Sequence, residues 1–164
     1  MAFAIHAQAQ FGGSGSGTAS DPYLITNEDE LFDVRNDLSA NYKLMADLDL
    51  TEWIAEESPK QGWAPIGNST TPFMGVFDGN YHSIKGLLIK RPDENYVGLF
   101  GVTRFATIKN TALIHPIIEG NSNIGMLIGN TCNQVNRSDN VKTNYIINNV
   151  TKVSQVMAHL HNLT

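Results

Sequence analysis

Hydrophobic residues occupy every second position between Tyr42 and Leu50, and mostly polar residues fill the positions between them. The first set is Tyr42, Leu44, Ala46, Leu48 and Leu50, and the second is Lys43, Met45, Asp47 and Asp49. A period of two places successive side chains on opposite faces of a strand. The pattern therefore predicts a strand over residues 42–50 with one buried face.

The segment before this strand has a helical period. A short apolar strand is expected at residues 23–25. Thr26 or Asn27 can then cap a helix, and the acidic residues 28–30 suit the positive end of the helix dipole. Apolar residues follow at helical spacing, at Leu31, Val34 and Leu38. We expect one helix of roughly three turns.

From Phe73 onward, short apolar segments recur. Residues 84–89 are matched by residues 108–113, a spacing of 24, and residues 97–101 are matched by residues 125–129, a spacing of 28. Short strands punctuated by Gly and Asn at such a period are typical of solenoids, in which each strand lies over its equivalent one turn earlier. Gly86 and its match Asn110 are expected to form corners, because both residue types tolerate a positive φ.

The beginning of the chain predicts export. Residues 1–9 are expected to be the remnant of a signal peptide, because the apolar start precedes Ala7-Gln8-Ala9, which has the small-x-small form of a signal-peptidase site. Cleavage there would leave Gln10 at the start of the mature chain. Residues 10–20 are rich in Gly and Ser and are expected to form a flexible linker.

The repeat fades after Asn130. Residues 133–149 are polar and irregular, and apolar residues then return at helical spacing at Val153, Val156, Met157, Leu160 and Leu163. This stripe predicts an amphipathic helix over residues 150–164. We expect it to cover the last coil near residues 125–129, or the equivalent surface of a second copy, because an open solenoid end invites self-association.

Composition narrows the class of protein. In 164 residues, 41% are hydrophobic and only 16% are charged, which suits one domain with a core and provides few charges for the faces of a helical bundle. The net charge is −5 and the Lys and Arg residues are scattered, so nucleic acid is not an expected partner. No apolar run approaches the ~20 residues of a membrane span, so the chain is not expected to span a membrane.

A series of motifs follows in a fixed order along residues 11–130. The motifs are Asp21-Pro-Tyr-Leu-Ile25, residues 42–50, Trp63-Ala-Pro-Ile-Gly67, residues 73–89, Gly98-Leu-Phe-Gly101 and residues 124–129. In this order they resemble bacterial surface proteins that carry GLUG motifs.

The resemblance implies a mainly β fold, a short right-handed parallel β-helix (a solenoid) with an N-terminal capping helix and a possible C-terminal helix. The β-helix domain would extend over residues 21–149, with repeat-like coils at about 73–130. In proteins of this kind, such segments occur in exported adhesins and as appendages of larger surface enzymes, including IgA-cleaving metallopeptidases.

Asp47 and Asp49 are the candidate carboxylate pair if the protein is an enzyme. On a strand they would share a face about 7 Å apart, inside the ~6.5–9.5 Å range of inverting glycosidases. The alternative is that they are solvated positions of a half-buried strand, and this is favoured because no base or cation is visible nearby in the sequence. No catalytic residue is therefore expected.

No metal site or cofactor is expected either. Asp78-Gly79-Asn80 could offer oxygen ligands to calcium, but the tripeptide is a strong turn signal, and the turn is the favoured interpretation. His82 is expected to support a corner by hydrogen bonding. Cys132, the single cysteine, cannot form an internal disulfide, and no Cys/His cluster has zinc-ligand spacing.

Four aromatic residues are candidate ligand contacts: Trp53, Trp63, Tyr81 and Tyr96. Aromatic rings offer flat apolar area with a polar group, which suits sugars and proteins alike. For Trp63, filling the end of the core is an equal alternative.

These observations lead to the hypothesis of a secreted or cell-surface β-helix module for adhesion or display. It would bind a glycan or protein on a host or neighbouring cell surface, without catalysis. A polysaccharide-active enzyme, or a carbohydrate-binding accessory to one, is the first alternative, and a structural spacer is the second.

Overall fold

The computed structural model describes residues 11–132. The expected signal-peptide remnant at 1–9, the irregular residues 133–149 and the expected helix at 150–164 lie outside this range. The described residues are mainly β, with two α-helices and one 3-10 helix. Every pair of hydrogen-bonded strands is parallel.

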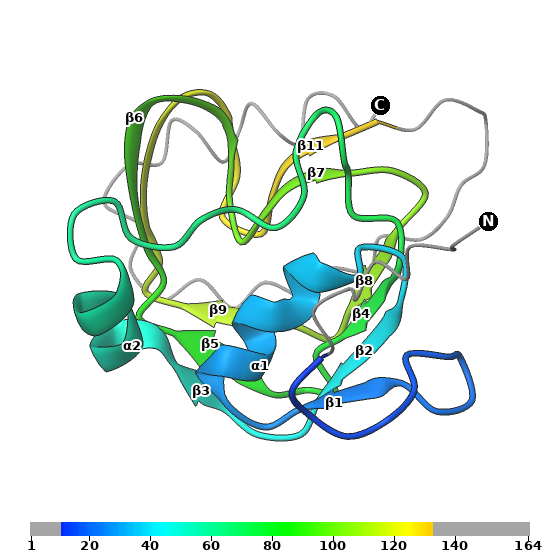
Figure 1. Ribbon diagram of the computed structural model, residues 1–164. Coiled ribbons are helices and arrows are strands. Elements are labelled where there is room, and N and C mark those ends of the chain that lie inside the picture. The colour runs from blue at the N-terminus through cyan, green and yellow to red at the C-terminus, as the bar shows by residue number, and fades with distance from the viewer. Residues whose placement is uncertain (1–10, 133–164) are drawn as a thin grey trace, which may run out of the picture.

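The strands form four sheets, which we name A to D (Figure 1). Sheet A consists of β1 (Tyr23–Ile25), β2 (Asn41–Leu44), β4 (Val76–Asp78) and β8 (Thr107–Lys109). Sheet B consists of β3 (Leu48–Asp49), β5 (Ser83–Lys85) and β9 (Ala112–Ile114). Sheet C pairs β6 (Leu88–Val97) with β10 (Ile117–Ile124). Sheet D pairs β7 (Phe100–Thr103) with β11 (Ile128–Thr131).

The chain runs through the four sheets in the same order twice. Residues 76–103 supply β4 to β7, and residues 107–131 supply β8 to β11. Residues 41–73 supply β2 to sheet A and β3 to sheet B, and they reach sheet D through parallel bridges at Ile66 and Phe73. We call these three segments the first, second and third pass.

The register between passes confirms one predicted repeat and corrects the other. Phe100 lies beside Ile128, which is the expected spacing of 28. The spacing of 24 is wrong, because Ile84 lies beside Leu113 and Ile108 lies beside Phe77. The two matched sequences each cross a corner, but residues 84–89 run from sheet B to sheet C, whereas residues 108–113 run from sheet A to sheet B.

The expected N-terminal helix is present but short. Asn27 caps α1 (Glu28–Asp33), with its Oδ1 accepting from the backbone N–H of Glu30 at 2.9 Å. The 3-10 helix η1 (Val34–Asn36) follows, and the helix ends there instead of completing three turns. The carbonyl of Asp37 accepts from the Tyr42 hydroxyl, and the carbonyl of Leu38 accepts from residues 74 and 75, so these backbone groups serve tertiary contacts.

The predicted strand 42–50 is divided in two. Tyr42, Leu44, Leu48 and Leu50 are buried as the alternation predicted, whereas Ala46 is only half-buried. However, residues 45–47 turn between sheets A and B, and Leu50 begins α2 (Leu50–Glu57), which the sequence analysis missed.

The Gly/Ser-rich segment expected to be a flexible linker is ordered from Phe11 onward. Phe11 is buried, and its ring lies 4.5 Å from that of Tyr23 and 5.7 Å from that of Tyr42. Ser14 forms an antiparallel bridge with Leu24. Glycine is required nearby because Gly15 has a φ of 97° and a Cβ there would overlap the Pro22 carbonyl. The segment therefore belongs to the folded part of the chain.

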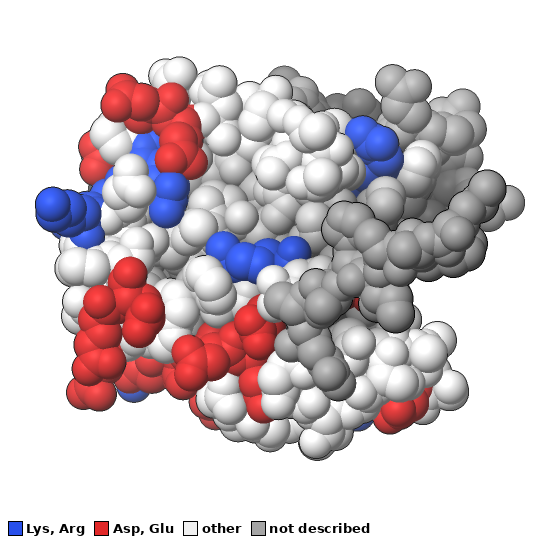
Figure 2. Space-filling model, viewed as in Figure 1, with Lys and Arg blue, Asp and Glu red and all other residues white. Residues whose placement is uncertain are grey.

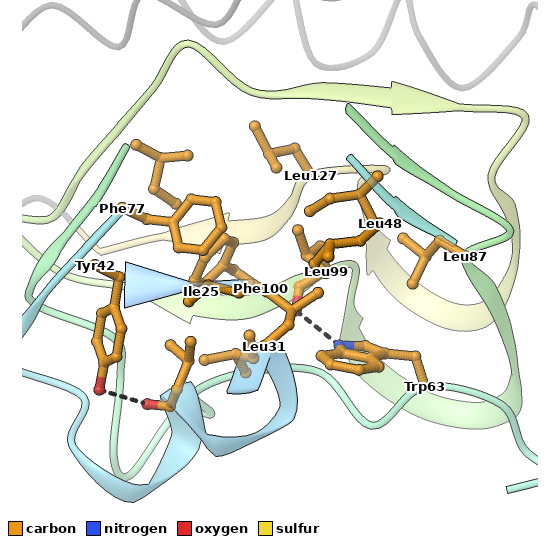
Figure 3. Packing of buried hydrophobic residues seen from close by; sticks show 14 of the residues in the cluster. Ile25, Leu31, Tyr42, Leu48, Trp63, Phe77, Leu87, Leu99, Phe100 and Leu127 are labelled. Atoms are coloured by element: carbon orange, nitrogen blue, oxygen red, sulfur yellow. Dashed lines mark hydrogen bonds between the residues drawn. The ribbon is translucent and has the colours of Figure 1, made fainter. Parts of the chain in front are cut away.

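One core lies inside the four sheets (Figure 3). Phe77 and Phe100 come from the second pass, Leu127 from the third, and Leu31 closes the N-terminal side from α1. Two polar groups enter it with partners: the Tyr42 hydroxyl donates to the Asp37 carbonyl at 2.7 Å, and Trp63 Nε1 donates to the Leu99 carbonyl at 3.3 Å. Burial, followed by the charge of Asp37, raises the pKa of Tyr42, so the phenol is a neutral donor.

Candidate functional site

Asp47 is held by the second pass. Its Oδ1 accepts from the Ser83 backbone N–H at 2.7 Å and from the Ser83 hydroxyl at 3.1 Å, and His82 Nδ1 lies 3.5 Å away. These hydrogen bonds, with the backbone one foremost, lower the pKa of Asp47. The carboxylate thus joins the first pass to the corner before β5, and the His82 side chain contacts it there.

Asp49 caps α2. Its Oδ1 accepts from the Thr51 hydroxyl at 2.6 Å and the Thr51 backbone N–H at 3.2 Å, and its Oδ2 pairs with Lys85 Nζ at 2.9 Å. The hydrogen bonds from Thr51 and Lys85 lower the pKa of Asp49 to about 2. No base or cation is near this carboxylate pair in the sequence, but the parallel register brings Lys85 and His82 to it from 36 and 35 residues away.

The tripeptide at residues 78–80 forms a turn. Asp78 Oδ1 accepts from the Asn80 backbone N–H at 2.9 Å and from Asn110 Nδ2 at 3.0 Å, and Oδ2 pairs with Lys109 Nζ at 3.1 Å. Burial acts to raise the pKa of Asp78, but these hydrogen bonds outweigh it, and the pKa is lowered. Within residues 11–132, no group of three or more His, Cys, Asp or Glu side chains is arranged to hold a metal ion.

The four candidate aromatic residues do not form one platform. Trp63 is fully buried and fills part of the core, so it does not belong to a ligand-contact surface. Trp53 is half-buried, its ring lies 5.6 Å from Trp63, and its Nε1 donates to Asp29 at 2.7 Å. Tyr81 is 82% exposed, Tyr96 is half-buried, and neither takes part in a ring pair within the part of the chain that the structure describes.

Arg35 is a structural residue that the sequence analysis missed. Its guanidinium lies 3.6 Å from the centre of the Phe32 ring, and its Nη2 donates to the Ala64 carbonyl at 3.2 Å. Arg91 Nε donates to the neighbouring Trp63 carbonyl at 3.2 Å. Burial, and then repulsion from Arg91, lower the pKa of Arg35 to about 10. The two arginines fix residues 63–64 against η1 and β6, and no local sequence pattern indicates this contact.

Exposed apolar side chains gather at the borders of sheet A. Of the five large exposed hydrophobic residues in the described range, Met45 and Tyr81 lie at the corner from sheet A to sheet B. Met74 and Phe105 lie at the corner from sheet D to sheet A. The fifth, Ile117, lies on β10. Phe105 was not identified from the sequence.

The outer side of sheet A carries two rows of mostly polar side chains in register on β2, β4 and β8. Tyr42, Phe77 and Ile108 point into the core, so their strand neighbours point outward. One row is Lys43, Asp78 and Lys109, and the other is Asn41, Val76 and Thr107. We call these six residues, with the four apolar residues at the two corners, the sheet A face.

Charge is distributed without a basic stripe on the side of the molecule drawn in Figure 2. Acidic side chains form separate groups there, and basic side chains are scattered between them. Acidic residues 28–30 occupy the first turn of α1, where their negative charges interact favourably with the positive end of the helix dipole.

Comparison with known proteins shows relatives that are much longer than this chain. No known protein-family model matches it. It is 39% identical over 122 residues to a protein of Evansella cellulosilytica named as a Gly-rich membrane protein. It is 32% identical over 124 residues to halomucin of Haloquadratum walsbyi. Each match covers 71% of the chain, but only 14% and 1% of the respective relative.

A solved structure shares the fold. The crystal structure of a protein of Bacteroides ovatus named as an immunoglobulin A1 protease matches with a TM-score of 0.57 and 25% identity. The match covers 72% of this chain and 33% of that one. No helix of residues 11–132 is both long and apolar enough to cross a membrane. The relatives are thus named as membrane or surface-type proteins, and the resemblance to GLUG-motif proteins stays a prediction.

Proposed function

We propose that the chain is an exported cell-surface module, built as a short right-handed parallel β-helix, that binds glycan or protein ligands for adhesion or display. The observation that carries this proposal is the recurrence of sheets A to D in the same order in the second and third passes, with parallel register throughout. Stacked passes give flat side walls with repeating side chains, which suit contact with extended or repetitive partners.

The relatives support a role as one part of a larger surface protein. The chain corresponds to 14% of a Gly-rich membrane protein, 1% of halomucin and 33% of an immunoglobulin A1 protease chain. These three names share no reaction, and the first of them gives a location, at a membrane. Transferred to this chain, that location is the cell surface.

The carboxylates support a role without catalysis. Glycoside hydrolysis needs one carboxyl group that keeps its proton near neutral pH. Asp47 and Asp49 both have lowered pKa values, and both contact the second pass, Asp47 through a hydrogen bond from Ser83 and Asp49 through an ion pair with Lys85. They therefore suit structural roles, and no particular contact favours the enzyme or the spacer alternative.

The test combines binding with a search for turnover. The full chain, fluorescently labelled, is applied to a glycan array and to intact cells, and reducing-sugar release is measured in parallel on each bound polysaccharide. We expect saturable binding without release of reducing ends. Sugar release that disappears in the Asp47→Asn/Asp49→Asn double variant would contradict the proposal and favour a hydrolase.

A further inference from the structure

Two exposed aromatic residues adopt a backbone conformation that does not suit them. Tyr81 has a φ of 65° and is 82% exposed, and Phe105 has a φ of 53° and is 58% exposed. The left-handed region costs free energy for any residue with a bulky side chain. Other corners hold residues that adopt it more readily, at Gly86, Asn110 and His115.

Neither ring recovers this cost by burial in the core. An exposed ring leaves its apolar area in water, so Gly or Asn at the same position would favour folding at least as well. Strained residues that the fold does not require are a known mark of functional surfaces. Both rings therefore point to contact with a ligand.

The two strained residues border the same sheet. The Tyr81 backbone N–H donates to the Asn110 carbonyl at 3.0 Å, which fixes the corner between sheets A and B. The Arg104 N–H donates to the Phe73 carbonyl at 2.8 Å, which fixes the corner between sheets D and A beside Phe105. Met45 and Met74 lie at the same two corners in the preceding segments. The sheet A face is thus a mostly polar surface, with Val76 in one row and an apolar, partly aromatic border on each side.

The polar rows between these borders repeat with the strands. Lys43, Asp78 and Lys109 occupy consecutive strands, about 4.8 Å apart from one to the next. Asp78 is already paired with Lys109, whereas Lys43 forms no ion pair within residues 11–132, so the row has a small positive excess. Such a row complements a ligand that repeats hydroxyl groups at short intervals and is neutral or weakly acidic.

We infer that the sheet A face binds an extended polysaccharide across its strands, with Tyr81 and Phe105 as aromatic contacts at the two borders. This inference rests on the proposed function and names the ligand class. Rings can stack on the apolar faces of sugar residues, and the row of ammonium, hydroxyl and amide groups can hydrogen-bond their hydroxyls.

The test uses affinity electrophoresis of the full chain in gels that contain one polysaccharide each. Hydroxyethyl cellulose and laminarin are the neutral probes, and polygalacturonate is the acidic one. The main variant is Tyr81→Asn/Phe105→Asn, because Asn tolerates a positive φ and should preserve or raise the melting temperature. Tyr81→Phe keeps the ring, and Ile117→Ser removes an exposed apolar side chain away from sheet A.

We expect at least one probe to retard the chain, and the double variant to weaken that affinity by about tenfold or more. Tyr81→Phe and Ile117→Ser should bind as the parent does. Retardation by no probe, or equal retardation of parent and double variant, would overturn the inference. Binding of the labelled chain to cells whose glycans have been oxidised by periodate would then leave the proposed function standing with a protein ligand. Absence of binding to untreated cells would overturn both.

Discussion

The first and second passes follow the same path through sheets A and B and then diverge. Asp49 and Lys85 lie side by side in register at the end of sheet B. After Asp49 the chain forms α2, whereas after Lys85 it turns at Gly86, with a φ of 72°, and enters β6. The third pass behaves like the second, because His115 has a φ of 50° and β10 follows.

The difference shows how one corner selects the next element. Asp49 accepts from the Thr51 N–H and hydroxyl, which satisfies groups that a helix start leaves unpaired. Gly86 instead takes the left-handed conformation that aims the chain along sheet C. In the first pass, α2 buries Leu50 and Ile54, and the buried Trp63 follows it beside the start of β6, where the Trp63 N–H donates to the Leu88 carbonyl.

The largest expected effect comes from removing the ring that fills this region of the first pass. Trp63→Ala should destabilise the protein by about 3–5 kcal/mol, because it leaves a cavity in the core and the Leu99 carbonyl loses a donor. Denaturant unfolding followed by circular dichroism measures the change. Trp53→Ala is the matched control, because removal of the half-buried Trp53 ring should lower the free energy of unfolding clearly less. A loss for Trp63→Ala no larger than that for Trp53→Ala would contradict the greater contribution of the buried ring.

The next effect compares the same corner in two passes. Gly86→Ala should cost about 2–4 kcal/mol, because a Cβ there would overlap Thr51 and the left-handed φ disfavours alanine. His115→Gly, at the equivalent corner of the third pass, should change stability by less than about 1 kcal/mol, because relief of strain offsets the added chain entropy. Thermal unfolding measures both. A tolerated Gly86→Ala would contradict the left-handed corner.

The smallest expected effect concerns the cap of α2 and its dependence on pH. The pKa of Asp49 is about 2 in the folded protein, below its usual value, so its charge stabilises the fold above about pH 4 and this stabilisation is lost as the pH falls towards 2. Asp49→Asn keeps a capping oxygen but cannot ionise. Its melting temperature should therefore be a few degrees lower than that of the parent at pH 7, and the difference should shrink as the pH falls to 2. A difference in melting temperature that stays constant from pH 7 to pH 2 would show that ionisation of Asp49 does not stabilise the fold.

The sequence predicted those parts of the fold that depend on local signals. The alternation from Tyr42 to Leu50 identified the buried side chains, the cap at Asn27 located the start of α1, and the spacing of 28 placed Phe100 beside Ile128. Burial and capping follow from residue types within a few positions, so a single sequence is sufficient for them.

The parts that were missed depend on partners distant in sequence. The spacing of 24 failed because corners of different sheets have similar sequences, and only stacking distinguishes them. Asp49 does lie in a strand, as predicted, but its role as the cap of α2 was missed. Lys85 and His82, which hold the carboxylate pair, come from the next pass, and the sheet A face joins residues from three passes.

The register between the second and third passes tests the account most directly. In a Cys132→Ser background, Ser83→Cys/Ala112→Cys places two small cysteines on paired positions of β5 and β9. Neighbouring strands lie close enough for a disulfide at such a pair. Ser83→Cys/Thr107→Cys tests the spacing of 24 instead. We predict that mild oxidation closes the first pair and leaves the second open, as read by mass spectrometry of the intact chain. Closure of the second pair with the first remaining reduced would contradict the stacked passes.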